Sequence, residues 1–227
     1  PNIDKLSVLS KIAKQFGYNY SFKLGDNLPK KLNAFLKETL ESGEKTLFQN
    51  LVASSMAKAK YTTKNIGHFG LAFSYYSHFT SPIRRYPDLL VHRILKFLLK
   101  VDTFSSLNLE GLCKHCSETE RNASLAERAS FKYMQALYFK NKIGNVFKGK
   151  ISGITEWGIY VVLNDSGCEG LIKLSSMTDD HYVYNSKEFC LTGYSSLKTF
   201  QLGQNIKVKI LKSDLERKQL YLSIINP

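Results

Sequence analysis

Residues 67–93, GHFGLAFSYYSHFTSPIRRYPDLLVHR, hold three His, six aromatic residues, three Arg and two Pro in one short span. The first half of this motif segment is rich in aromatic and small residues, which predicts a strand that leads into a loop. Thr80 or Ser81 is then a helix N-cap, and Pro82 stands at the first helical position, where its missing N–H costs no hydrogen bond. The motif segment therefore predicts a strand, a loop and a helix in succession.

Arg84 and Arg85 fall in the first turn of that expected helix. Basic residues are unfavourable there, because a helix N-terminus already carries partial positive charge. They make sense if backbone N–H groups and guanidinium groups hold an anion together. A solvated basic helix end beside a buried aromatic strand is the alternative. Pro87 either kinks the helix or restarts it at Pro87 and Asp88.

Beyond Pro87 the helix should be anchored in a core, because four apolar residues recur at helical spacing: Leu90, Ile94, Phe97 and Leu98.

The motif segment resembles the signature of the RNB family of processive 3′-to-5′ exoribonucleases in two stretches, GHFGLA and SHFTSPIRRYPDLLVHR. This family includes ribonuclease R and ribonuclease II. The match to the ribonuclease R branch is closer. The resemblance implies that Arg84 reaches the phosphate at the RNA 3′ end and stabilises charge that develops as the bond breaks. Arg85 binds an adjacent phosphate or pairs with Asp88, three residues on. Arg84 is thus the expected catalytic residue, and Arg85 is the alternative.

The same resemblance implies non-catalytic roles for four other residues of the motif. His78 and Tyr86 are expected to line an RNA channel, although an aromatic residue before Pro87 also suits a core. His68 and His92 are expected to be structural.

The charge of the chain indicates a polyanionic partner. The 227 residues carry a formal net charge of +13. Residues 1–143 hold 22 Lys and Arg against 11 Asp and Glu, whereas residues 144–227 hold 10 against 8. Single-stranded RNA is the leading partner. An anionic membrane surface is disfavoured, because a basic amphipathic anchor is missing from the sequence.

The four Cys are expected to be reduced cytoplasmic thiols rather than disulfides or metal ligands. Cys113 and Cys116 have the spacing of half a zinc site, but Cys168 and Cys190 do not form a second close pair. No apolar run approaches the roughly 18 residues that span a bilayer. No small-molecule cofactor apart from metal is expected.

Four further segments of the first 143 residues show helical periodicity. They are residues 3–16, a short helix around residues 32–40, residues 44–60, and residues 109–143, which predict a helical hairpin or one long bent helix. In the last of these the expected inward positions are Leu125, Ala129, Met134, Leu137 and Tyr138.

Residues 144–227 predict a different architecture. Five strand-like runs, at residues 146–151, 158–163, 168–174, 206–211 and 220–225, alternate with Gly or polar turns. Five short strands in this length suit a small Greek-key barrel of the OB type. The fold class is therefore α+β: mainly helical in residues 1–143, followed by a five-stranded OB-fold barrel in residues 144–227.

Three segments resemble an S1 RNA-binding domain: GNVFKGKISGITEWGIYVVL, GCEGLIKLSS and IKVKILKSD. Carried over by position, the resemblance implies that Trp157, Tyr160 and Lys173 face RNA, with Asp214 at a further surface position. Packing inside the barrel is the alternative for the two aromatic residues. Lys173 stands where His is frequent, and residues 176–200 form a long insertion.

The resemblance also implies a cluster of Asp residues that binds divalent metal, usually Mg²⁺. Asp179 and Asp180 form one adjacent pair, which is expected to be a solvated loop, and no D-x-D spacing occurs. We therefore expect residues 1–143 to be the C-terminal part of an RNB catalytic domain whose metal ligands lie upstream. An RNA-binding module whose helical half docks a partner protein is the second hypothesis.

Overall fold

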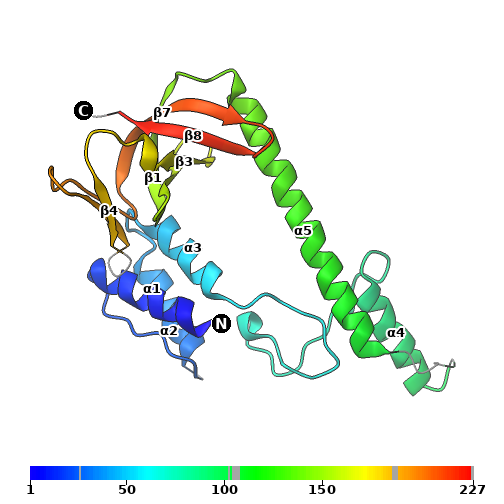
Figure 1. The fold of residues 1–227 in the computed structure, drawn as a ribbon. Helices are drawn as coiled ribbons and strands as arrows, with labels where there is room; N and C mark the ends of the chain where they lie inside the picture. The colour runs from blue at the N-terminus through cyan, green and yellow to red at the C-terminus, as the bar shows by residue number, and fades with distance from the viewer. Residues whose placement is uncertain (26, 102, 104–107, 186–188, 226–227) are drawn as a thin grey trace.

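The computed structural model describes residues 1–225 except residues 26, 102, 104–107 and 186–188. A cluster of three helices lies beside a β-barrel, and the long helix α5 runs from the barrel to helix α4 at the far end of the molecule (Figure 1). Helices come first along the chain and strands second, so the predicted α+β class is confirmed. Within the described ranges, no helix is long and apolar enough to cross a membrane.

The first three helices share an aromatic core. They are α1 (Ile3–Gln15), α2 (Leu28–Glu38) and α3 (Lys45–Ser55). Phe35 and Phe48 are fully buried there, with their ring centroids 4.9 Å apart in an edge-to-face contact. Such a contact adds stability beyond the burial of the two rings. Helix α1 agrees with its prediction, and the chain leaves it through Gly17 at φ +89°.

Helix α3 ends at Ser55, so the predicted extension to residue 60 is wrong. Met56 has extended backbone, with ψ of 144°. The hydroxyl groups of Ser54 and Ser55 donate to the carbonyls of Leu51 and Val52, which competes with continuation of the helix. The chain then crosses to α5, where the Tyr61 N–H donates to Ser117 Oγ at 2.9 Å.

The motif segment departs from the prediction in its first half. Residues 67–79, all of them described, form no strand: His68 and Phe73 make an isolated bridge around the 3₁₀ turn η1 (Phe69–Leu71). Ala72 takes a left-handed conformation at φ +56°, which interrupts an extended chain. Helix α4 (Tyr86–Leu98) begins at Tyr86. A helix from Pro82 is therefore wrong, and the restart at Pro87 is confirmed.

Helix α4 is anchored less deeply than its spacing predicts. Leu90 is only 4% exposed and Ile94 is partly buried, but Phe97 and Leu98 are 47% and 67% exposed. Residues 109–140 form one helix, α5 (Leu109–Lys140), so the hairpin is wrong.

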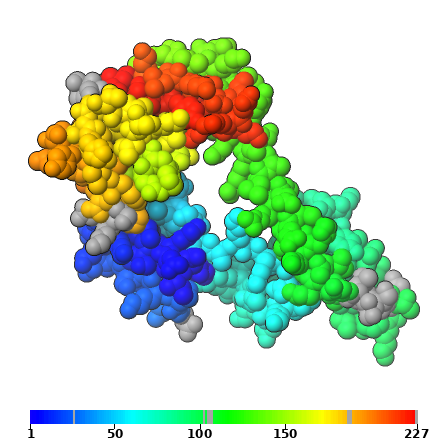
Figure 2. All heavy atoms as spheres, viewed as in Figure 1, coloured from blue at the N-terminus to red at the C-terminus, as the bar shows by residue number. Residues whose placement is uncertain are grey.

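The predicted inward positions of α5 are also wrong in most cases. Leu125, Met134, Leu137 and Tyr138 are exposed and Ala129 is partly exposed, whereas the buried residues are Cys116, Ala136 and Phe139. In the space-filling view α5 forms a narrow bridge between the barrel and α4 (Figure 2). Periodicity predicted one continuous inward face, but this helix is packed mainly near its ends.

The predicted five-stranded barrel is confirmed. It closes in the order β1-β2-β3-β8-β7, with β3 and β8 parallel and the other pairs antiparallel. The strands are β1 (Val146–Thr155), β2 (Gly158–Leu163), β3 (Glu169–Lys173), β7 (Asn205–Asp214) and β8 (Gln219–Ile224). Alternating residues such as Ile159, Val161 and Leu163 are fully buried. Phe139 of α5 joins this core, so the end of α5 and the barrel pack as one body.

The insertion contains a small sheet that the sequence did not reveal. Its order is β4 (Tyr182–Asn185), β5 (Cys190–Gly193) and β6 (Thr199–Gln201), preceded by the turn η2 (Leu174–Ser176). Phe189 and Leu202 pack against the core of α1, α2 and α3. Residues 186–188 of the predicted insertion lie outside the described residues. The change from helix to strand falls between Lys140 and Val146, and the division at residues 143 and 144 stays a prediction.

Candidate nucleic-acid interface

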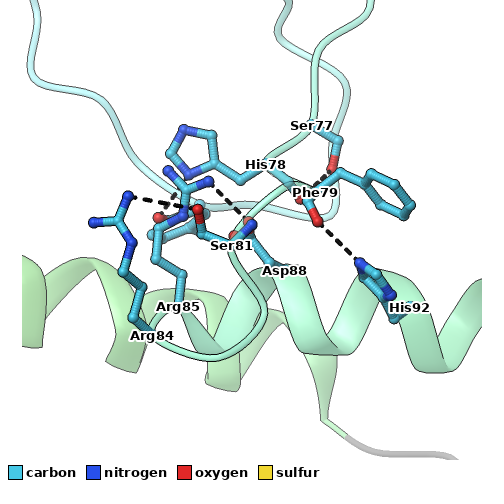
Figure 3. Close-up of polar contacts among 9 residues, drawn as sticks. Ser77, His78, Phe79, Ser81, Arg84, Arg85, Asp88 and His92 are labelled. Atoms are coloured by element: carbon cyan, nitrogen blue, oxygen red, sulfur yellow. Dashed lines mark hydrogen bonds and ion pairs between the residues drawn. The ribbon is translucent and has the colours of Figure 1, made fainter.

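The turn before α4 is organised by one buried carboxylate, Asp88. Its Oδ2 accepts the Ser81 N–H at 2.8 Å and Arg85 Nη2 at 2.8 Å (Figure 3). The Arg84 and Arg85 N–H groups donate back to the Ser81 carbonyl at 3.3 and 3.0 Å. Because Asp88 binds the Ser81 N–H from within α4, the chain closes into a tight turn instead of continuing as helix from Pro82.

Arg85 and Asp88 form an ion pair, which was one of the two alternatives expected for Arg85. The Asp88 side chain has no exposed surface, and that of Arg85 is 27% exposed. Burial raises the pKa of Asp88, but hydrogen bonds from the Ser81 N–H and Arg85 outweigh it and hold the pKa below its ordinary value. The hydrogen bond to Asp88 raises the pKa of Arg85. Asp88 Oδ1 and Arg85 Nε are buried without a hydrogen-bond partner, so the first atom can still accept a hydrogen bond and the second can still donate one.

Arg84 has a different environment from its neighbour. Its side chain is exposed, and Nη2 lies 3.5 Å from Ser81 Oγ, at the limit of a hydrogen bond. Figure 3 shows both guanidinium groups extending from the turn toward the side where His78 lies. The structure therefore leaves Arg84 available to an external anion, while Arg85 is engaged by the fold.

His78 belongs to a network that reaches α5. Its Nδ1 lies 2.9 Å from the Tyr61 hydroxyl, and its ring makes edge-to-face contacts with Tyr61 and Tyr76. Burial raises the pKa of Tyr61 to about 12, and the charge of Glu120 adds to the effect. Tyr86 is 40% exposed and can contact a ligand from the same end of α4.

The other two His of the motif make local contacts. His92 Nε2 donates to the Phe79 carbonyl at 2.9 Å, and its ring stacks on Phe79 with centroids 4.3 Å apart (Figure 3). His68 Nδ1 accepts the Leu71 N–H at 3.0 Å. Both rings thus hold the motif loop in shape.

The barrel carries a second group of candidate residues on its outer face. Trp157 lies in the β1–β2 turn and is 63% exposed, which excludes barrel packing as its role. Tyr160 is opposite Leu171 on β3, which in turn pairs with Tyr221 on β8. Lys173 Nζ lies 4.4 Å from the centre of the Tyr221 ring. Tyr160 and Lys173 therefore lie on the outer face of β2 and β3, and Lys173 covers the Tyr221 ring of β8, which is only 9% exposed.

Tyr221 was missed by the sequence analysis, although alternation along residues 219–224 could have assigned it to the outer face. Arg217, which precedes β8, was missed as well. A hydrogen bond with the Tyr221 hydroxyl raises the pKa of Arg217.

Asp214, the last of the predicted RNA-facing residues, is engaged within its own turn. Its carboxylate accepts the Arg217 N–H at 3.0 Å and Lys212 Nζ at 3.0 Å. These two hydrogen bonds hold the pKa of Asp214 below its ordinary value. The structure assigns the Asp214 carboxylate to the β7–β8 turn, and its contact with RNA stays a prediction.

Asp180 is more than the solvated loop residue that was expected. Its carboxylate accepts the N–H groups of His181, Ser195 and Ser196 at 2.7, 3.1 and 2.7 Å, and it also accepts the Ser196 hydroxyl. Hydrogen bonds with Ser196 are the main reason that its pKa lies far below the ordinary value. Asp180 therefore holds the insertion together.

A divalent metal does not fit the described residues. No three His, Cys, Asp or Glu side chains in this part of the chain converge as a metal site. The nearest carboxylate pair, Asp179 and Asp180, is engaged with Tyr182 and with the serines of the insertion. We assign no metal-dependent step to the residues that the structure describes.

Two family models and several known proteins match this chain. Residues 1–101 match the RNB domain and residues 140–225 match the S1 RNA binding domain. Ribonuclease R of Aquifex aeolicus is 38% identical over 99% of this chain and 32% of its own length. Ribonuclease R of Buchnera aphidicola subsp. Schizaphis graminum is 36% identical, again over 99% of this chain and 32% of its own length.

The solved structure of Mycoplasma genitalium RNase R in complex with ribose methylated single-stranded RNA has a TM-score of 0.89 and 27% identity, and the match covers 99% of this chain and 36% of that chain. The chain spans about a third of the length of the curated relatives that it matches.

Proposed function

This chain belongs to the RNB family of ribonucleases, on its ribonuclease R branch, and from that premise we propose that it acts in RNA degradation by a processive 3′-to-5′ exoribonuclease. The enzyme hydrolyses single-stranded RNA to nucleoside monophosphates. This chain supplies a phosphate-contacting arginine and an RNA-binding barrel to that reaction.

The observation that carries the proposal is the contrast between Arg84 and Arg85. Asp88 fixes the turn through Ser81 and Arg85, and this leaves the Arg84 guanidinium exposed on a rigid support. A preorganised cation of this kind stabilises negative charge that develops on a phosphate as its ester bond breaks. Arg84 is accordingly the catalytic arginine of the proposal, and Arg85 is a positioning residue.

RNA capture is divided between the two halves of the chain. The exposed ring of Trp157 can stack on a base, and Tyr160 and Lys173 extend the same outer face of the barrel. The helical half carries most of the positive charge, with 22 basic against 11 acidic residues in residues 1–143, and attracts the phosphate backbone. His78 and Tyr86 stand beside the arginine turn, where they contact the 3′ end of the RNA.

Mg²⁺ is the proposed metal, because RNB nucleases are metal-dependent hydrolases and magnesium is the ion that carboxylate clusters hold beside phosphates. It would supply charge stabilisation and an activated water. Its ligands are not among the described residues. A cytoplasmic location is also proposed, and the four free cysteines support a reducing compartment.

A chimaera tests the proposal. This chain replaces the corresponding region of Aquifex aeolicus ribonuclease R, to which it is 38% identical. We expect the chimaera to release nucleoside monophosphates from a 5′-labelled single-stranded RNA without a ladder of intermediates. Circular dichroism and RNA binding verify that it folds. A folded chimaera that binds RNA but degrades none of it would contradict the proposal.

A non-catalytic RNA-binding module remains the second candidate function. The identity to ribonuclease R extends through the helical half as well as the barrel, which does not favour a docking role for that half alone.

A further inference from the structure

Tyr61 joins the motif to α5 at the point where the chain crosses from α3. Its N–H donates to Ser117 Oγ of α5 at 2.9 Å, and that hydroxyl in turn donates to the Cys113 carbonyl at 2.8 Å. The Tyr61 hydroxyl lies 2.9 Å from His78 Nδ1, and the two rings meet edge-to-face with their centroids 5.4 Å apart. The backbone of Tyr61 is thus attached to α5, and its side chain is attached to the motif.

The two residues after Tyr61 reinforce this attachment. Glu110 of α5 accepts the Thr63 N–H at 2.9 Å and the hydroxyls of Thr63 and Thr62 at 2.5 and 3.1 Å. The hydrogen bond from the Thr63 hydroxyl is the main reason that the pKa of Glu110 lies below its ordinary value. Glu110 and Ser117 are about two helical turns apart, so one face of α5 fixes the segment. Tyr61 therefore rests on a rigid support.

The Tyr61 hydroxyl has one proton to donate and two groups that could accept it, His78 Nδ1 and the Glu120 carboxylate of α5. Burial raises the pKa of Tyr61 to about 12, and the charge of Glu120 and a hydrogen bond to it add to the effect, so the hydroxyl stays protonated. Hydrogen bonds to ionised acceptors are roughly twice as strong as those between neutral groups. The hydroxyl proton is therefore directed to Glu120, and Tyr61 Oη accepts a hydrogen bond from His78 Nδ1–H.

This arrangement leaves His78 Nε2 as a hydrogen-bond acceptor, because a neutral imidazole carries a single N–H. In the described part of the chain Nε2 has no hydrogen-bond partner, and the ring is also held by an edge-to-face contact with Tyr76 at 5.7 Å. His78 is partly exposed, and Figure 3 shows its ring on the side to which the Arg84 and Arg85 guanidinium groups extend. The site thus offers an acceptor beside two groups that only donate.

An acceptor in this place selects a donor on the ligand. A phosphodiester has no hydrogen-bond donor, so its oxygens suit the exposed Arg84 guanidinium and not His78 Nε2. The ribose 2′-hydroxyl is a donor that stands beside each phosphate of an RNA strand and is absent from DNA. Arg84 and His78 Nε2 together therefore match the phosphate and the neighbouring hydroxyl of one ribonucleotide.

We propose that Tyr61 is a positioning residue of the nuclease site. Together with Glu120 it holds His78 as the Nδ1–H tautomer, and His78 Nε2 accepts a hydrogen bond from the ribose 2′-hydroxyl of the nucleotide whose phosphate Arg84 binds. The inference rests on the proposed function and deepens it, because it assigns a group that distinguishes RNA from DNA. Tyr61 and Glu120 act through His78 and do not contact the RNA.

Long-range ¹H–¹⁵N spectra of the 227-residue chain, labelled at its five His, test the tautomer directly. They are recorded at about pH 8, above the ordinary histidine pKa of about 6.5. The signals that His78→Phe removes belong to His78, and we expect them to show Nδ1–H in the wild-type chain. Tyr61→Phe keeps the ring, removes the hydroxyl and should move His78 toward the other tautomer. Tyr133→Phe, at an exposed position of α5, should not.

The role of Glu120 has its own pair of variants. Glu120→Ala removes the charged acceptor of the Tyr61 hydroxyl, so the hydroxyl can donate to His78 Nδ1 and the Nε2–H form should increase. Glu118→Ala is the matched control, because Glu118 is also an exposed carboxylate of α5. An Nε2–H tautomer in the wild-type chain would overturn the inference and leave the proposed function intact.

Fluorescence anisotropy with labelled oligouridylates tests the contact with ribose. A single 2′-deoxyuridine is placed at one position after another, and one position should weaken binding to the wild-type chain about three- to tenfold, as for the loss of one hydrogen bond. That effect should fall below about twofold in His78→Phe, become smaller in Tyr61→Phe and stay unchanged in Tyr133→Phe.

The outcomes separate this inference from the proposed function. If every deoxyuridine position had the same effect on the wild-type chain and on His78→Phe, the contact between His78 and ribose would be overturned while RNA binding stood. A wild-type chain that does not bind RNA would overturn both.

Discussion

Arg84 and Arg85 are adjacent and have the same side chain, yet the fold uses them differently. Arg85 donates to a carboxylate that is completely buried, whereas Arg84 has one long contact with a serine hydroxyl. The sequence left two partners open for Arg85, an adjacent phosphate or Asp88 at i+3, and the structure shows the ion pair with Asp88. The exposure of Arg84 depends on the turn that Asp88 closes, and spacing alone does not predict such a turn.

Replacing Arg84 should slow catalysis without weakening binding. In the nuclease chimaera, Arg84→Ala is expected to lower the single-turnover rate by about 10²–10³, as for the loss of one preorganised donor. RNA affinity should stay within about twofold, because many other cations contact the backbone. Arg93→Ala, at an exposed position of α4, is the control. A loss of affinity in proportion to the rate would make Arg84 a docking residue.

Asp88 should make the stability of the chain sensitive to acid. Its pKa in the folded chain lies below the ordinary 3.8, so its contribution is present above pH 3.8 and is lost as the pH falls through the folded value. Asp88→Asn is expected to lower the free energy of unfolding by about 1–3 kcal/mol above that pH. The difference from wild type should shrink as the pH falls. Urea unfolding on both sides of pH 3.8 measures it, and a difference that is the same at every pH would contradict the role of the charge.

At the scale of elements, the barrel was predictable and the small sheet of the insertion was not. Strand β2 alternates buried Ile159, Val161 and Leu163 with two partly buried residues, and β8 has an apolar residue at every second position over six, which is enough to recognise the two-residue period of a strand. Strands β4, β5 and β6 have four, four and three residues, too short for a period to be distinguished from a loop. Their shape depends on Asp180, whose hydrogen bonds reach Ser195 and Ser196.

Removing the Asp180 carboxylate should loosen the insertion and spare the barrel. Asp180→Ala is expected to speed amide hydrogen exchange at Ser195 and Ser196 about 10- to 100-fold, because these N–H groups lose their acceptor. Exchange in β2 and β8 should not change. Asp179→Asn is the control, since its Oδ2 accepts the Tyr182 hydroxyl and neither serine N–H. Unchanged exchange at both serines would show that the β5–β6 connection is held by other contacts.

At the scale of the whole molecule, positive charge is concentrated in the helical half, whereas exposed aromatic residues occur in both halves. The helical half carries the excess of basic residues, and the nearly neutral barrel carries Trp157, at 63% exposure, on its surface. We therefore expect phosphate attraction to act mainly from the helical half, from which α5 runs to the barrel (Figure 1), and base stacking to draw on exposed rings of both halves, such as Tyr75 and Trp157. The first contribution is screened by salt, and the second is much less so.

The affinity of the purified 227-residue chain for single-stranded RNA should fall steeply as the salt concentration rises, and the chain should not degrade RNA. If five phosphates are neutralised, a plot of log affinity against log salt should have a slope of roughly −3.5. Hydrolysis with Mg²⁺ or Mn²⁺ is not expected, because the described residues contain no cluster of His, Cys, Asp and Glu that could hold either ion. Fluorescence anisotropy over a range of salt concentrations measures the slope, and gel analysis of labelled RNA tests for hydrolysis. A slope near zero would favour a protein partner for the helical half. Release of mononucleotides from the 3′ end by this chain alone would mean that metal binding involves residues beyond those described.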